Sequence, residues 1–96
     1  MIATVTLNPS LDEWMELPAL RVGALHRAHS FARYPGGKGI NVSRVMHELG
    51  SRSVAYAFVG GWDGDMLRHA LAQLGVTGVF VPVHGATRNN YKILTA

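Results

Sequence analysis

An apolar run of six residues, VAYAFV at 54–59, lies between two segments with helical spacing, and this order restricts the fold more than any other feature. An apolar run without alternation is typical of a strand that is covered on both faces in a parallel sheet. Residues 40–49 repeat apolar side chains at the i, i+3, i+4 and i+7 spacing of a helix face, and residues 67–74 do the same. We therefore predict an α/β fold on a parallel sheet with right-handed crossovers.

The ends of these elements have their own signals. Gly50 and Gly75 stand where a left-handed glycine would end each helix, and Asp63 is the expected N-cap of the second helix. Pro9 and its polar neighbours predict a turn after a first strand at residues 2–7. Residues 76–83 and 90–96 are expected to form further extended segments. Short, partly exposed strands are expected within residues 12–34.

Composition narrows the class of protein. A chain of 96 residues forms at most one small domain or part of one, and its 48% hydrophobic content is typical of a folded protein. The net charge of +3 comes from scattered basic residues, which favours a small anionic ligand and argues against nucleic acid. The absence of cysteine, of a signal peptide and of a membrane-length apolar run leads us to expect a cytoplasmic protein.

The glycine-rich segment YPGGKGINVSR, residues 34–44, leads directly into the first helix and has two interpretations. The glycines could form a tight turn that brings the helix close to its sheet. Alternatively, the free N–H groups of the helix N-terminus, with Lys38 and Asn41, could bind hydroxyls or phosphate. Neither a Walker A loop nor a dinucleotide fingerprint fits, because Lys38 is followed by Gly39 and residue 42 is Val.

Two other polar groups could lie beside this loop. Asp12 follows the first strand, at the edge of an α/β sheet where ligands gather, although it could equally be a turn residue or a solvated charge. Arg88, Asn90 and Lys92 alternate, so an extended chain would direct all three to one face. A solvated strand face is the alternative for this second group. The histidines show no metal-ligand spacing, and no metal site is predicted.

Taken together, the segments TLNPSLD, HRA, YPGGKGINVSRVMHELG, VGGWDGD and TRNNYKI resemble the N-terminal third of the PfkB branch of the ribokinase family. The resemblance is strongest to its 1-phosphofructokinase and tagatose-6-phosphate kinase group. It implies a ribokinase-like fold, in which residues 1–96 form the N-terminal portion of a Rossmann-like parallel sheet. Residues 12–34 would form a small β-lid that covers the substrate and pairs two subunits into a homodimer.

The resemblance also implies an activity, the ATP-dependent phosphorylation of a sugar phosphate, with Mg²⁺ as the expected ion. In a 1-phosphofructokinase the reaction converts fructose 1-phosphate to fructose 1,6-bisphosphate. By position, Asp12 is similar to the residue that binds sugar hydroxyls, and Arg88 to the arginine that holds the existing phosphate. The remaining expected substrate-binding residues are Gly37, Lys38, Asn41, Asn90, Arg27 and Lys92.

The chain departs from the family in its chemistry. The catalytic base of a GAGD-like motif, and most of the nucleotide site, belong to a C-terminal part that these residues do not contain, so no catalytic residue is predicted here. Whether the chain is itself an enzyme is therefore left open. The alternatives are a truncated, non-catalytic module that binds sugar phosphate or dimerises through its lid, and a piece without a function of its own.

Overall fold

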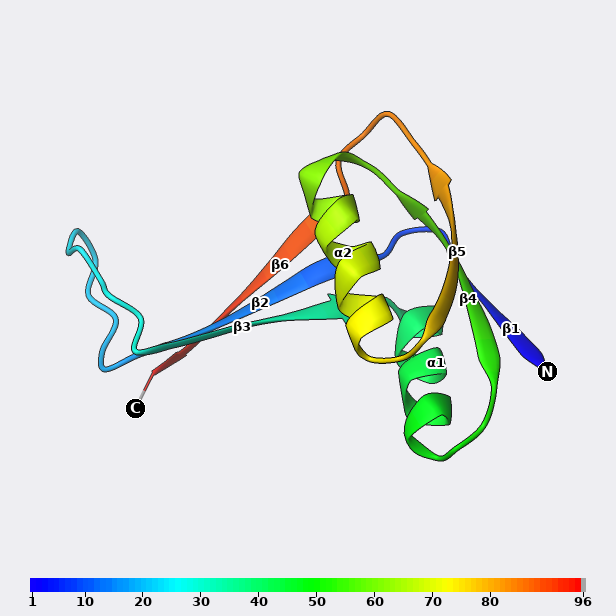
Figure 1. Ribbon diagram of the computed structural model, residues 1–96. Helices are drawn as coiled ribbons and strands as arrows, with labels where there is room; N and C mark the ends of the chain where they lie inside the picture. Colours follow the sequence, from blue (N-terminus) through cyan, green and yellow to red (C-terminus); the bar gives the residue numbers. More distant parts are fainter. Residues whose placement is uncertain (96) are drawn as a thin grey trace.

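The computed structural model describes residues 1–95, and it shows a small α/β body from which three long strands project (Figure 1). We call these three strands the lid and the remaining elements the body. In chain order the elements are β1 (Ile2–Thr6), β2 (Ser10–Leu17), β3 (Ser30–Gly36), α1 (Lys38–Glu48), β4 (Ser53–Val59), α2 (Gly61–Gln73), β5 (Thr77–Pro82) and β6 (Arg88–Thr95).

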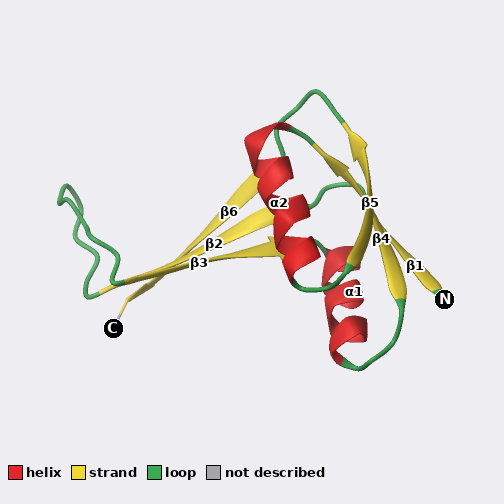
Figure 2. Cartoon of the chain, in the orientation of Figure 1, coloured by secondary structure: helices red, strands yellow, loops and turns green. Residues whose placement is uncertain are grey.

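The body confirms the predicted parallel sheet. Its strands lie in the order β1-β4-β5, and both neighbouring pairs are parallel. The helices α1 and α2 connect them and lie on the same face of the sheet (Figure 2). This placement follows from topology, because two right-handed crossovers that advance in the same direction put their helices on one side.

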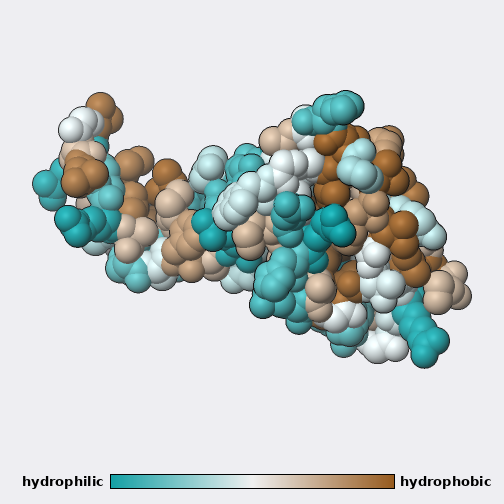
Figure 3. All heavy atoms as spheres, turned by 45° about the horizontal axis from the view of Figure 1, so that its top comes forward, coloured by the Kyte–Doolittle hydropathy of each residue, from teal (hydrophilic) through white to brown (hydrophobic). Residues whose placement is uncertain are grey.

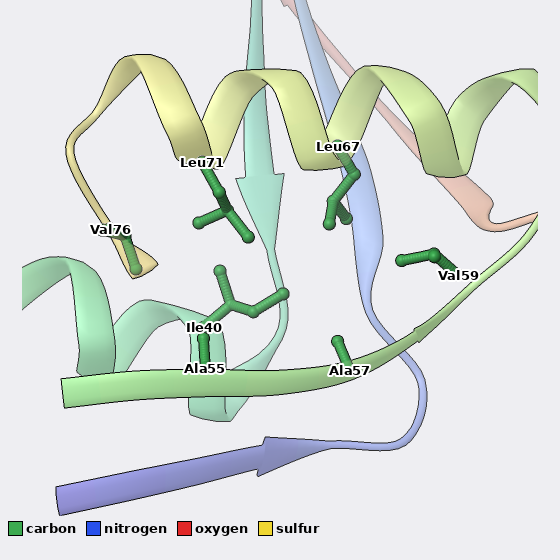
Figure 4. Close-up of a cluster of buried hydrophobic side chains, with 7 residues drawn as sticks. All are labelled: Ile40, Ala55, Ala57, Val59, Leu67, Leu71 and Val76. Atoms are coloured by element: carbon green, nitrogen blue, oxygen red, sulfur yellow. The ribbon is translucent and has the colours of Figure 1, made fainter. Parts of the chain in front are cut away.

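The core lies between these helices and β4 (Figure 4). Every second residue of β4 points toward the helices, so Ala55, Ala57 and Val59 are buried. Leu67 and Leu71 come down from α2, one helical turn apart, and are completely buried. The small alanines allow the helices to approach the sheet closely, and the leucines fill the space above them.

The prediction that residues 54–59 are covered on both faces is wrong for the described chain. Tyr56 and Phe58 point away from the helices and remain 42% and 39% exposed. Val5, Val79 and Val81 are exposed on the neighbouring strands, and the register aligns Val5 and Val79 with Tyr56. We call these five residues the open sheet face. Hydrophobic side chains can be followed along this side of the body in the space-filling view (Figure 3).

The helix ends are confirmed in part. Gly50 and Gly75 both have a φ near +80° and end their helices as predicted. The predicted N-cap at Asp63 is wrong, because α2 begins at Gly61 and Gly60 is its N-cap. Thr87 fixes this start: its Oγ1 accepts a hydrogen bond from the Gly60 N–H, and its own N–H donates to the Gly60 carbonyl. Asp63 therefore lies within the first turn, where its charge suits the helix dipole.

The lid is a second sheet of order β3-β2-β6. β2 and β3 are antiparallel, as expected for strands within 12–34, whereas β6 pairs with β2 in parallel. The sequence pattern did not reveal that β6 leaves the body sheet. Ser10, predicted as a turn residue, is buried and is the first residue of β2. In residues 1–95, neither helix has the length and hydropathy that a membrane crossing requires.

Candidate functional site

Asp12 lies at the base of the lid, where three polar side chains from two strands converge on it. Its Oδ1 accepts hydrogen bonds from Ser10 Oγ at 2.8 Å and from Asn90 Nδ2 at 3.2 Å. The register explains the second contact, because Asp12 lies directly opposite Asn90 across the β2/β6 pair. One carboxylate oxygen is thus held by the protein, which fixes the orientation of the group.

The other oxygen of Asp12 is less occupied. Within the described chain, its polar neighbour is Lys92 Nζ, at 3.8 Å from Oδ2. Lys92 also lies 4.6 Å above the ring of Trp14, so its cation is held between a carboxylate and an aromatic face. Asp12 Oδ2 is consequently able to accept a hydrogen bond from a ligand hydroxyl.

Arg88 brings a second cation to the same side of the lid. Its guanidinium donates to Asn90 Oδ1 at 3.4 Å and to the Asn8 carbonyl at 3.3 Å, both long contacts. Arg88 is exposed, and a planar guanidinium with weak internal bonds can still offer two parallel donors to a phosphate. The predicted alternation of Arg88, Asn90 and Lys92 is confirmed, since β6 is extended through all three.

The glycine-rich segment brings the N-terminus of α1 to this cluster. A Cβ at Gly36 would lie 2.6 Å from Asp12 Oδ2, and one at Gly39 would lie 2.5 Å from Thr6 Oγ1. Gly37 has a φ of +126°, which only glycine adopts readily. Close packing alone therefore explains these glycines, in agreement with the tight-turn interpretation. The same packing leaves Lys38 and Asn41 exposed in the first turn of α1.

Arg27 is the predicted site residue that the structure does not bring to the cluster. It lies in the loop of residues 18–29, at the far end of β2 and β3 from the body (Figure 1). There it lines a shallow crevice of about 370 Å³ with Arg21 and His26. The resemblance predicts Arg27 by its position along the chain, and that position does not show how far β2 and β3 extend away from the body.

A groove of about 450 Å³ continues from the cluster along the lid. We call it the lid groove. Alternation along β2 places Trp14 and Glu16 on the same face as Asp12, so the groove and the polar cluster share one surface. Its lining residues are Trp14, Glu16, Ser30, Phe31, Ala32, Tyr34 and Leu94.

The opposite face of the lid holds polar residues that the sequence did not single out. Glu13 is buried, and its Oε1 accepts a hydrogen bond from Arg33 Nε at 2.6 Å. The negative charge of Glu13 raises the pKa of Tyr91 above its ordinary value, and desolvation acts in the same direction. Glu13 directly follows Asp12 in the sequence, and only the three-dimensional pairing distinguishes the surroundings of the two acids.

The arrangement suits a polar, anionic ligand. A carboxylate oxygen that can accept from hydroxyls lies beside Lys92 and near Arg88, at the junction between lid and body. In residues 1–95, no group of three or more His, Cys, Asp or Glu side chains is placed to hold a metal ion. The cluster thus combines one carboxylate oxygen with two cations and the side-chain amide of Asn90.

Comparisons with known proteins agree with the fold. The family described as pfkB family carbohydrate kinase matches residues 5–96. The 1-phosphofructokinase of Bacillus subtilis (strain 168) is 43% identical over 95 residues, which is 99% of this chain and 31% of that protein. The 1-phosphofructokinase of Borreliella burgdorferi is 40% identical over 94 residues, or 98% of this chain and 31% of that one.

A solved structure is also similar. Phosphofructokinase-2 from Escherichia coli, in complex with fructose-6-phosphate, has a TM-score of 0.88 at 35% identity, over 96% of this chain and 30% of that chain. The same enzyme has been solved in a tetrameric inhibited form. This chain therefore spans about a third of the length of the relatives that it matches. Because the family match covers nearly the whole sequence, the chain belongs to the PfkB family of carbohydrate kinases.

Proposed function

We propose that this chain supplies the sugar-binding and lid part of an ATP-dependent 1-phosphofructokinase. The reaction transfers the γ-phosphoryl group of ATP to the free hydroxymethyl group of fructose 1-phosphate, giving fructose 1,6-bisphosphate and ADP. The observation that carries the proposal is the convergence of Asp12, Asn90, Lys92 and Arg88 at the base of the lid. Two relatives named 1-phosphofructokinase, at 43% and 40% identity, favour this substrate.

In this proposal, Arg88 and Asp12 hold opposite ends of the sugar phosphate. The Arg88 guanidinium binds the phosphate already present through two charge-assisted hydrogen bonds. Asp12 Oδ2 accepts from a sugar hydroxyl, while Asn90 and Ser10 keep its other oxygen fixed. Lys92 adds positive charge beside both groups. Such positioning lowers the barrier by holding the acceptor hydroxyl in one geometry.

The N-terminus of α1 completes the sugar side. Gly37, Lys38 and Asn41 lie in the turn that packs against the cluster, where free N–H groups and a mobile cation can meet sugar hydroxyls. The lid strands exclude water, so that the phosphoryl group passes to the sugar and not to solvent. We leave Arg27 out of the proposed site, because it lies in the distal loop.

ATP and Mg²⁺ enter the proposal through the family. The described residues gather no set of acidic or histidine side chains that would hold the ion, so we assign the metal, the nucleotide site and the catalytic base to the part of the kinase beyond the matched third. When bound, Mg²⁺-ATP supplies the phosphoryl group. Residues 1–96 then form the N-terminal portion of the kinase domain, with the lid inserted in it.

We further propose that two copies pair through the lid groove. Tyr34 and Leu94 expose apolar surface there, and the outer edges of β3 and β6 have no neighbouring strand in the described chain. The tetrameric form of the Escherichia coli enzyme shows that a relative assembles from several copies.

Replacing Arg88 tests the proposed function in the complete protein that carries this chain. Arg88→Ala removes both donors to the phosphate, so the KM for fructose 1-phosphate should rise about tenfold or more, while that for ATP stays within about twofold. Steady-state kinetics with each substrate varied in turn measures the two constants. Arg68→Ala, an exposed arginine on the body, is the matched control.

An unchanged KM for fructose 1-phosphate in Arg88→Ala would show that Arg88 does not bind the phosphate. The intact mass of the protein made by its native cell tests the second candidate, a non-catalytic module that binds sugar phosphate through the same cluster. A mass near 10.4 kDa, together with binding of fructose 1-phosphate in calorimetry, would favour that module, whereas a much larger mass would favour the complete kinase.

A further inference from the structure

Behind the proposed site, a row of side chains crosses all three lid strands. Glu13 lies directly opposite Arg33 on β3 and opposite Tyr91 on β6. One residue away along β2, Asp12 lies opposite Tyr34 and Asn90 in the same register. Because successive side chains of a strand point to opposite faces, the two rows are back to back. We call the first the rear row.

The rear row is anchored by a buried charge. Glu13 is only 5% exposed, and its carboxylate forms a 2.6 Å hydrogen bond with Arg33 Nε. A buried carboxylate that loses its cation is strongly destabilised, so this pair holds Arg33 in one place. The bond occupies Arg33 Nε and leaves the two faces of the guanidinium available for stacking contacts.

Those faces lie against two aromatic rings, one of them on the body. The Arg33 guanidinium carbon is 4.7 Å from the ring centre of Phe31 and 5.5 Å from that of Trp62. Trp62 is the second residue of α2, and α2 contacts both β2 and β3. A cation–π contact thus spans the junction between lid and body.

We propose that Trp62, acting through Arg33 and Glu13, is a positioning residue for the sugar-phosphate site. By fixing the base of the lid against α2, it sets where Asp12 and Asn90 lie relative to the N-terminus of α1. The part of this proposal that concerns ligand binding rests on the proposed function, because that function names what the site binds. The mechanical part, that Trp62 sets the angle of the lid, stands on the contacts of the rear row alone.

The mechanical part is tested by distance measurements between two spin labels. Residues 1–96 contain no cysteine, so Ser30→Cys on the lid and Gln73→Cys on α2 are the two labelling sites within this chain. We expect one narrow distance distribution for the wild-type sequence and a broad or shifted one for Trp62→Ala. Trp62→Phe, which keeps an aromatic face, should remain close to wild type. Circular dichroism verifies that each variant is folded.

Arg68→Ala is the matched control for these measurements. Arg68 lies on the same helix and makes a cation–π contact with Phe80 at 5.5 Å, the distance found for Arg33 and Trp62, but within the body. Its removal should leave the label distances unchanged. A folded Trp62→Ala with the wild-type distribution would overturn the proposal, and so would an equal broadening in Arg68→Ala.

The functional part is tested by calorimetry with fructose 1-phosphate on the same variants. Trp62→Ala should weaken binding about five- to tenfold, and Trp62→Phe should restore most of the affinity. A broadened label distribution without loss of affinity would overturn the positioning role. Failure of the wild-type protein to bind fructose 1-phosphate would contradict the proposed function instead, while the label distances would still decide whether Trp62 sets the lid angle.

Discussion

Asp12 and Glu13 are adjacent acids in β2 whose surroundings differ on the two faces of one sheet. Asp12 is partly exposed and holds one oxygen ready for a ligand, whereas Glu13 is buried against Arg33. The sequence pointed to Asp12 because it follows the first strand and matches a family motif. It could not assign Glu13, because its partner is twenty positions away and no pattern links them.

Tyr91 reports the charge of Glu13. Because the pKa of Tyr91 is raised when folded, its protonated form contributes stability that is fully present below about pH 10 and is lost as the pH rises through the folded pKa. Asp63 raises this pKa further and Arg33 opposes the shift. Glu13→Gln, which removes the charge, should therefore lower the pKa of Tyr91.

Phenolate absorbance measured against pH follows this titration, with Tyr91→Phe identifying the contribution of Tyr91. Urea unfolding at rising pH should also show that Tyr91→Phe lacks one component of the alkaline loss of stability. The same Tyr91 titration in Glu13→Gln and in the wild type would contradict the assignment of Glu13 as the cause.

Among the elements, the helices were the most predictable. The apolar spacing of α1 and α2 follows directly from the burial of one helix face, so their existence and type are confirmed. The start of α2 was missed because Thr87, far along the chain, fixes it. β6 was predicted as extended, but its place in the lid depends on pairing with β2, which local pattern does not encode.

The packing of α2 gives a direct stability prediction. Leu67→Ala empties a completely buried position above β4, so it should lower the free energy of unfolding by about 2–5 kcal/mol. Leu74→Ala is the control on the same helical segment, because Leu74 is 42% exposed and should cost clearly less. Urea titrations followed by circular dichroism compare the two. Equal losses would contradict the assignment of the core to this face of α2.

At the scale of the molecule, two apolar surfaces face outward. The open sheet face lies on the body, and the lid groove lies on the projecting sheet. The apolar run at residues 54–59 predicted a strand of a parallel sheet that is covered on both faces, and β4 does pair in parallel with both of its neighbours. The described helices can cover only one face, however, because both crossovers advance in the same direction.

Sedimentation velocity distinguishes these surfaces as sites of self-association. If the lid groove pairs two copies, the wild-type chain sediments at twice the mass of the 10.4 kDa chain, and Leu94→Lys shifts it to the monomer. Phe58→Lys places the same charge on the open sheet face at a similar exposure and should leave the dimer intact. Dissociation by Phe58→Lys but not by Leu94→Lys would contradict pairing through the lid.

The parallel pairing of β2 with β6 has a consequence for synthesis. Asp12 and its partner Asn90 are 78 positions apart, and β6 leaves the ribosome after every other described element. The core between α1, α2 and β4 can form earlier, from residues that are closer together in the chain. A nascent chain that stops before Arg88 therefore contains the residues of its core but cannot assemble the cluster around Asp12, so stability is acquired before the capacity to bind.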